Sequence, residues 1–186
     1  MQKLFKIVKD TSKSLRERCK EVEEITPEII DLVNDMAEYL KLTQDDSYRD
    51  KHHLREGVGL AAPQIGHNIR ALVVYFEEED EDGNVRIIDH RLINPRIISE
   101  SVKKVYLSCG EGCLSVDASH EGYVYRNFKI LVKAYEVKEA KEIVITARGY
   151  EAIVLQHEID HLNGILFYDH IDKKDPFKVL PDAVRI

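Results

Sequence analysis

The segment His157-Glu158-Ile159-Asp160-His161 limits what this chain can fold into more than any other stretch. Two histidines four positions apart share one face only on a helix, where both imidazoles can meet a single metal ion. Glu158 follows the first histidine and can take a proton from a metal-bound water. Apolar residues recur at helical spacing through the surrounding segment, so we expect a helix over 149–162. The alternative is an exposed polar helix face that carries two unrelated histidines.

Two histidines do not complete a catalytic metal site, which usually takes three protein ligands and leaves one position open for water. The extended zinc-protease pattern would place a third histidine where this chain has Phe167, and phenylalanine cannot ligate. A metzincin is therefore disfavoured. Cys113 is the obvious candidate, because neighbouring glycines let the backbone bring its thiolate close to an ion. Cys109 could pair with Cys113 as a disulfide or as a second ligand, but we expect it and Cys19 to be structural or incidental.

A third unusual segment is Gly57-Val58-Gly59-Leu60-Ala61-Ala62-Pro63-Gln64-Ile65-Gly66. It is not a phosphate loop, because no Gly-Lys-Ser/Thr follows. It also fails the dinucleotide fingerprint, whose third glycine falls at Ala62. Small residues at this density suggest a backbone that approaches a ligand closely. The alternative is a tight turn packed beneath a helix.

The remaining pattern predicts an α+β fold with antiparallel strands around the C-terminal helix at 149–162 and an N-terminal helix on the outside. Thr26, Pro27 and Glu28 are typical of a helix start, and apolar residues follow at helical spacing to Leu42. We expect a polar surface insertion over 43–55, in which His52 and His53 are solvated. The acidic tract at 77–84 reads as a solvated hairpin tip. Because strands cluster between two helices, alternating βαβ units are disfavoured; the expected strands are 71–76, 86–93, 96–105, 123–135 and 143–147.

Composition excludes several classes of protein. The chain has 186 residues and 44% hydrophobic residues, which suits a single domain over 1–186 with a substantial core. A formal charge of -7 argues against sequence-independent binding to DNA or anionic lipid. No apolar run approaches the ~20 residues of a membrane span. Three cysteines without an export signal indicate a reducing, cytoplasmic location.

Taken together, three segments are far more specific than any one. Gly-Val-Gly-Leu-Ala-Ala-Pro-Gln at 57–64, Glu-Gly-Cys-Leu-Ser at 111–115 and Gln-His-Glu-Ile-Asp-His at 156–161 occur in this order. They resemble the three signature motifs of the peptide deformylase family, and the resemblance covers essentially the whole chain. The insertion before Gly57 and the short C-terminal tail resemble the type 2 branch found in Gram-positive bacteria. Cys109 and the 117–121 stretch depart from that branch.

The resemblance implies a hydrolase that removes the formyl group from the N-terminal formyl-methionine of newly synthesised proteins and releases formate. Cys113, His157 and His161 would bind one divalent metal, with Fe²⁺ expected and Zn²⁺, Ni²⁺ or Co²⁺ able to substitute. Metal-bound hydroxide would attack the formyl carbon, with Glu158 as general base. In the family the oxyanion is stabilised by the metal, by the backbone N–H of the residue at Leu114 and by the side-chain amide at Gln64.

The resemblance also implies where the substrate lies. Tyr150 and Val154 precede His157 by seven and three residues, so they project from its face of the helix. They would wall a pocket for the methionine side chain, although plain core packing is an alternative from this chain alone. Val58, Gly59 and Gly112 would offer backbone groups to an extended peptide, as in strand addition. The expected partners are N-formylmethionyl nascent peptides, with transient contact to the ribosome and no membrane.

Three other interpretations remain open at this point. A zinc metallopeptidase could recruit Asp169 or Asp172 as its third ligand. A structural metal site in a binding module could use Cys109 in the fourth position. A deformylase-like protein of altered specificity is disfavoured, because all proposed catalytic positions are intact. For Asp160, orientation of a histidine and a surface ion pair are equally compatible with the sequence.

Overall fold

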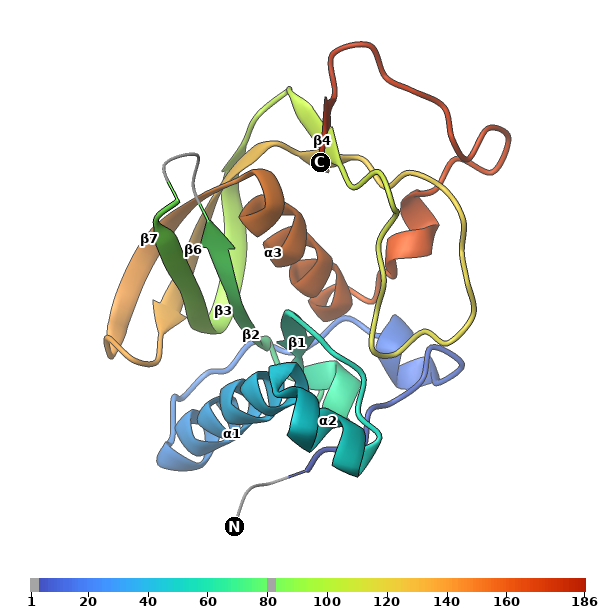
Figure 1. Ribbon diagram of the computed structural model, residues 1–186. Coiled ribbons are helices and arrows are strands. Elements are labelled where there is room, and N and C mark those ends of the chain that lie inside the picture. The colour runs from blue at the N-terminus through green and yellow to red at the C-terminus, as the bar shows by residue number, and fades with distance from the viewer. Residues whose placement is uncertain (1–3, 80–82) are drawn as a thin grey trace.

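The computed structural model describes residues 4–79 and 83–186 and places two sheets around one helix (Figure 1). The larger sheet has five strands in the order β1-β2-β3-β6-β7, and every neighbouring pair is antiparallel. Its strands are β1 (Gly59–Ala61), β2 (Ala71–Glu79), β3 (Val85–Glu100), β6 (Lys129–Glu136) and β7 (Lys141–Arg148). The smaller sheet has the order β5-β4-β8, with strands β5 (Arg126–Asn127), β4 (Lys104–Tyr106) and β8 (Val184–Arg185).

The central element is α3 (Gly149–Leu162), which packs on one face of the larger sheet and also contacts β4 and β5. Strand alternation explains this arrangement, because successive side chains of a strand point to opposite faces. On β2, Leu72, Val74 and Phe76 join the core that contains α3. Since α3 is covered from several sides, nearly all of its side chains are buried.

The opposite face of the same sheet is covered by α1 (Pro27–Gln44). Ala71 and Val73 of β2 pack there in a second core, which contains the buried face of α1. The helix therefore lies on the outside of the sheet relative to α3. The predicted α+β class, the central C-terminal helix and the outer N-terminal helix are all confirmed. No helix in the described part of the chain is both long and apolar enough to cross a membrane.

The predicted helix boundaries are close to those observed. The prediction for 149–162 matches α3 at both ends, and α1 extends two residues beyond the predicted Leu42. Thr26 occupies the N-cap position of α1, although its side chain makes no capping hydrogen bond to the backbone. The polar insertion lies mostly at the surface, although Thr43 is buried and His52, which was expected to be solvated, is only partly exposed. It contains the short helix α2 (Asp46–His52), which was not predicted. Asp45 caps α2 by accepting the backbone N–H of Tyr48.

Three strand predictions were wrong in their limits. The segments 86–93 and 96–105 were expected to be separate strands, but β3 continues through Asn94-Pro95 and ends at Glu100. Asn94 has a φ of 52°, and the register between β3 and β6 shifts between Ile93 and Arg96. Leu92 and Ile93, before the shift, pair with β2 on one side and with β6 on the other. Such a bulge accommodates a proline inside a sheet. The predicted strand 123–135 begins only at Arg126 and is interrupted between β5 and β6.

The acidic tract lies between two paired strands, as a hairpin requires. Glu79 of β2 is opposite Val85 of β3 in antiparallel register. Residues 80–82, where the turn was predicted, lie outside the described residues. Sequence reasoning missed β1 and β8, which are three and two residues long and too short to show an alternating pattern.

Candidate metal centre

The helix α3 presents the two candidate histidine ligands to the interior of the protein. It starts directly after β7, where Gly149 adopts a φ of 54° that is readily available to glycine. His157 and His161 lie one helical turn apart, and their ring centroids are 4.9 Å from each other. Both side chains are nearly inaccessible to solvent. Burial lowers the pKa of His161 well below its usual value, which keeps the imidazole in the neutral form that binds metals.

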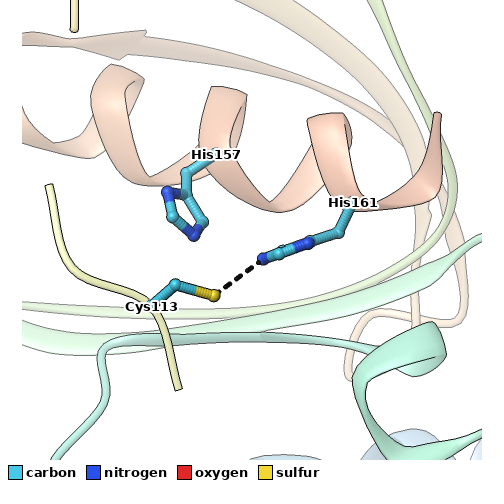
Figure 2. A group of neighbouring side chains, drawn as sticks. All are labelled: Cys113, His157 and His161. Carbon is cyan, nitrogen blue, oxygen red and sulfur yellow. Dashed lines mark hydrogen bonds between the residues drawn. The ribbon is translucent and has the colours of Figure 1, made fainter. Parts of the chain in front are cut away.

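Cys113 lies opposite these histidines, on the long irregular segment between β4 and β5 (Figure 2). Its Sγ is 3.3 Å from Nε2 of His161. One ligand atom from each of Cys113, His157 and His161 lies within 4.8 Å of the others. A thiolate and two imidazoles suit zinc and other divalent transition metals. This donor set, buried and convergent from two segments distant in sequence, fits a metal ion.

The alternative ligands lie elsewhere. Cys109 is exposed, and its thiol donates to the carbonyl of Gly110. Asp169 pairs with Arg16, and Asp172 accepts backbone N–H groups of its own turn. Within residues 4–79 and 83–186 none of these three joins the Cys113 group, and all three cysteines are free. Cys19 is a core residue, and burial raises its pKa to about 11.

Glu111 fixes the orientation of His157. Its Oε2 is 2.8 Å from Nδ1 of His157, which leaves Nε2 to face Cys113. Burial alone would raise the pKa of Glu111, but hydrogen bonds from Arg126 and His157 outweigh it and lower the pKa to about 2. The carboxylate is therefore ionised at neutral pH, and it holds the imidazole as the outer partner of a metal ligand does.

Asp160 has a different role from either one considered for it. Its carboxylate accepts a hydrogen bond from buried Arg126 and lies 2.7 Å from Nε2 of His170. Arg126 also donates to Glu111 at 2.8 and 3.0 Å. Asp160 thus contacts neither candidate histidine ligand and does not form a simple surface pair. It supports His157 only at a distance, through Arg126 and Glu111.

Glu158 is a buried carboxylate with an incomplete set of partners. It is 4% exposed, and burial raises its pKa to about 7. Its Oε2 has no hydrogen-bond partner within the described residues. The backbone of Gly59 lies directly against the Glu158 side chain, so that a Cβ added there would be 2.7 Å from the carboxyl carbon. The close backbone approach inferred for the glycine-rich segment is thus to this side chain.

Gln64 connects the glycine-rich segment to Cys113. It belongs to a 3₁₀ turn, Ala62–Ile65, and its Oε1 accepts the backbone N–H of Ala61 at 2.8 Å. That bond fixes the amide so that Nε2 points towards Ser115 Oγ at 3.2 Å and Cys113 Sγ at 3.6 Å. The amide N–H groups of Gln64 are therefore directed at the proposed metal position.

A cavity of about 380 Å³ opens beside this group. Every predicted site residue except His161 lines it, and His161 contacts the lining residue Cys113 through its Nε2. The predicted residues on its wall are Val58, Gly59, Gln64, Gly112, Cys113, Leu114, Tyr150, Val154, His157 and Glu158. Tyr150 and Val154 also pack on the core around α3. The same side chains therefore line the cavity, as a substrate pocket requires, and take part in core packing.

Sequence reasoning missed two residues of the site, Glu111 and Arg126. Glu111 was noted only as part of the cysteine motif, and Arg126 lies 15 positions further along the chain. Each is 4% exposed in its side chain, and charged residues are almost never buried unless paired. The one available signal was the position of Glu111 between two glycines, and this position does not indicate which residue the carboxylate pairs with.

The sequence and the fold of this chain are similar to those of known proteins. A family model described as polypeptide deformylase matches residues 4–177. A peptide deformylase of the Gram-positive bacterium Macrococcus caseolyticus is 48% identical, with 97% of this chain and 96% of the relative aligned. The crystal structure of Ehrlichia chaffeensis peptide deformylase in complex with actinonin has a TM-score of 0.75 at 36% identity and covers 93% of this chain and 91% of its own. A Met-Ala-Ser-bound class I type b peptide deformylase from Acinetobacter baumannii has a TM-score of 0.70 at 26% identity and covers 92% and 100%.

Proposed function

The chain belongs to the peptide deformylase family and is an enzyme that removes the N-formyl group from nascent proteins; we propose that it does so as a metal-dependent hydrolase acting on formyl-methionine. Similarity to the Macrococcus enzyme is consistent with the Gram-positive-like branch. The observation that carries the metal dependence is the convergence of Cys113, His157 and His161 within 4.8 Å at the end of a cavity.

In this proposal those three residues hold one divalent ion, Fe²⁺ in the cell, with Zn²⁺, Ni²⁺ or Co²⁺ as substitutes. Such an ion polarises a carbonyl group and lowers the pKa of a coordinated water towards ~7. Glu111 holds His157 from behind, which aligns the ring before any ligand arrives.

Glu158 is the proposed general base and acid. With a pKa of about 7 it is poised to accept a proton and to release it again near neutral pH. Its carboxylate takes the proton of the attacking water and then delivers it to the amine nitrogen that leaves with the peptide. The unpartnered Oε2 and the position of Glu158 on the cavity wall support this role.

Two groups of this chain are proposed to stabilise the oxyanion that forms at the formyl carbon. They are the Nε2 amide of Gln64 and the backbone N–H of Leu114. Both residues line the cavity next to Cys113, and Gln64 is fixed by its bond to Ala61. Losing one such donor typically raises the barrier by about 3 kcal/mol.

The methionine side chain is proposed to pack in the cavity against Tyr150 and Val154, which form an apolar part of its wall. β1 is an edge strand, so the backbone of Val58 and Gly59 can add the substrate as a further strand, opposite Gly112. The Acinetobacter neighbour binds Met-Ala-Ser, a peptide that begins with methionine. We propose a cytoplasmic location, because nascent chains are made on the ribosome. At a net charge of -7, any transient contact with ribosomal RNA would need a local basic patch.

Formate release from formyl-Met-Ala-Ser by the anaerobically purified protein, with metal analysis, tests the proposal. Cys113→Ala separates the alternatives, because a metallopeptidase that does not use Cys113 would keep its metal and activity. A deformylase with the proposed ligand set loses both. Formate release by a metal-free sample at the rate of the loaded protein would overturn the metal dependence.

A further inference from the structure

The segment that carries Cys113 and Leu114 belongs to no helix or strand. Between β4, which ends at Tyr106, and β5, which begins at Arg126, the chain is irregular. Ordering such a segment costs conformational entropy that no backbone ladder offsets. Yet the reaction proposed above needs the Cys113 thiolate and the Leu114 N–H to stay in register with Glu158. Something outside the segment must fix them.

Donors from two other parts of the chain meet this segment. The carbonyls of three consecutive residues each accept one donor: Leu114 from Lys9 Nζ at 3.4 Å, Ser115 from the backbone N–H of Asp10 at 2.9 Å, and Val116 from Arg55 Nη1 at 2.9 Å. These donors come from the N-terminal segment, which passes beside the 107–125 loop in Figure 1, and from the wall of the substrate cavity.

Asp117 joins the two cations. Its Oδ1 accepts Lys9 Nζ at 2.7 Å and Arg55 Nη1 at 3.2 Å. One carboxylate oxygen therefore contacts both cations while they donate to the carbonyls of Leu114 and Val116. The lowered pKa of Asp117, caused first by the hydrogen bond from Lys9, agrees with this contact.

We propose that Asp117, held between Lys9 and Arg55, is a positioning residue that keeps residues 113–116 in the geometry needed for deformylation. The inference rests on the proposed function and adds to it a residue that touches neither substrate nor metal. Its side chain is 66% exposed, and the Lys9 and Arg55 side chains are 45% and 51% exposed. Exposed ion pairs contribute little to folding stability, so the effect of Asp117 should appear in catalysis rather than in Tm.

The test compares Asp117→Asn with a matched control, Glu142→Gln. Glu142 forms an ion pair with Lys133 at 2.9 Å and is 67% exposed, but it lies on β7 away from the cavity. We expect Asp117→Asn to lower kcat about tenfold, because a displacement of the order of 1 Å can cost up to 10²-fold in rate. KM, metal content and Tm should change little, and Asp117→Glu should recover most of the lost rate. Glu142→Gln should match the wild type.

A second readout does not depend on the activity of the loaded enzyme. The N–H groups of Ser115 and Val116 donate to Sγ and O of Cys113, and their exchange can be measured on protein from which metal has been removed. Hydrogen exchange at these two amides should be faster in Asp117→Asn than in the wild type and unchanged in Glu142→Gln. Should Asp117→Asn fail to fold, Lys9→Gln removes one of the two cations and should change both readouts in the same direction.

Wild-type kcat, or wild-type exchange at Ser115 and Val116, in the Asp117→Asn variant would overturn the inference. A loss of kcat accompanied by a fall in Tm would also overturn the inference, since that combination indicates general destabilisation. Failure of the proposed function looks different, because the wild-type protein itself would then release no formate. The exchange comparison would still decide whether Asp117 orders the segment.

Discussion

Replacing Gly59 by alanine tests the placement of Glu158 from the opposite wall of the site. A Cβ added at Gly59 would press on Oε1 of Glu158 and lie 2.7 Å from Cδ and 2.8 Å from Cγ. Ordinary van der Waals contacts lie between 3.4 and 4 Å, so the carboxylate must retreat by about 1 Å. Glu158 is 4% exposed and sits on a buried helix, so this displacement moves it along the cavity rather than into solvent.

A 1 Å misplacement of a catalytic group can cost about 10²-fold in rate. We therefore expect Gly59→Ala to lower kcat for formyl-Met-Ala-Ser about a hundredfold. Overpacking costs ~1–3 kcal/mol, which corresponds to a fall in Tm of several degrees for a chain of this size. Metal content should be unchanged, because the three atoms nearest to the added Cβ all belong to Glu158, which is not one of the candidate ligands.

The assay is steady-state formate release, together with metal analysis and thermal unfolding. Gly112→Ala serves as the control for Tm, because a methyl group added at Gly112 meets no atom within 4 Å. The wild-type kcat in Gly59→Ala would refute the reasoning. It would mean that Glu158 either tolerates the displacement or has no part in the chemistry.

Three further predictions concern individual polar groups. Burial raises the pKa of Glu158 to about 7, so the buried carboxyl binds its proton more tightly in the folded state. Urea unfolding of the metal-free protein should therefore show the wild type losing stability relative to Glu158→Gln as pH rises from about 4.5 to about 7. Glu111→Gln should weaken Zn²⁺ binding about 10–100-fold in chelator competition, and unchanged affinity would remove Glu111 as the partner that orients His157. Gln64→Ala should lower kcat about 10²–10³-fold, and it should also lower Tm because the Ala61 N–H loses its acceptor.

The parts of the fold that could be predicted are those with a strong local pattern. The helix at 149–162 was located at both ends because its apolar spacing and its histidine pair agree. The long β3 could not be predicted in one piece, because Asn94-Pro95 normally ends a strand. Here the left-handed Asn94 lies at a bulge, and β3 stays paired with β6 on both sides of it.

The candidate site also has residues that could be predicted from the sequence and residues that could not. Residues within motifs, such as Cys113 and His157, could be proposed from spacing and from resemblance to a family. The Glu111–Arg126 pair could not, because a buried ion pair depends on which distant segments the fold brings together. The close contact of Gly59 with Glu158 was equally hidden, since a glycine in a sequence does not reveal which side chain needs its space.

The most direct test of the account is the fate of formyl-Met-Ala-Ser with the wild type and with Glu158→Gln, measured by formate release and metal content on the same samples. We expect the wild type to yield one formate per Met-Ala-Ser formed. Glu158→Gln should retain a full complement of metal and turn over at least about 10²-fold more slowly, since general acid–base groups contribute about 10²–10⁴-fold. Wild-type turnover by the Glu158→Gln variant would contradict the proposed mechanism.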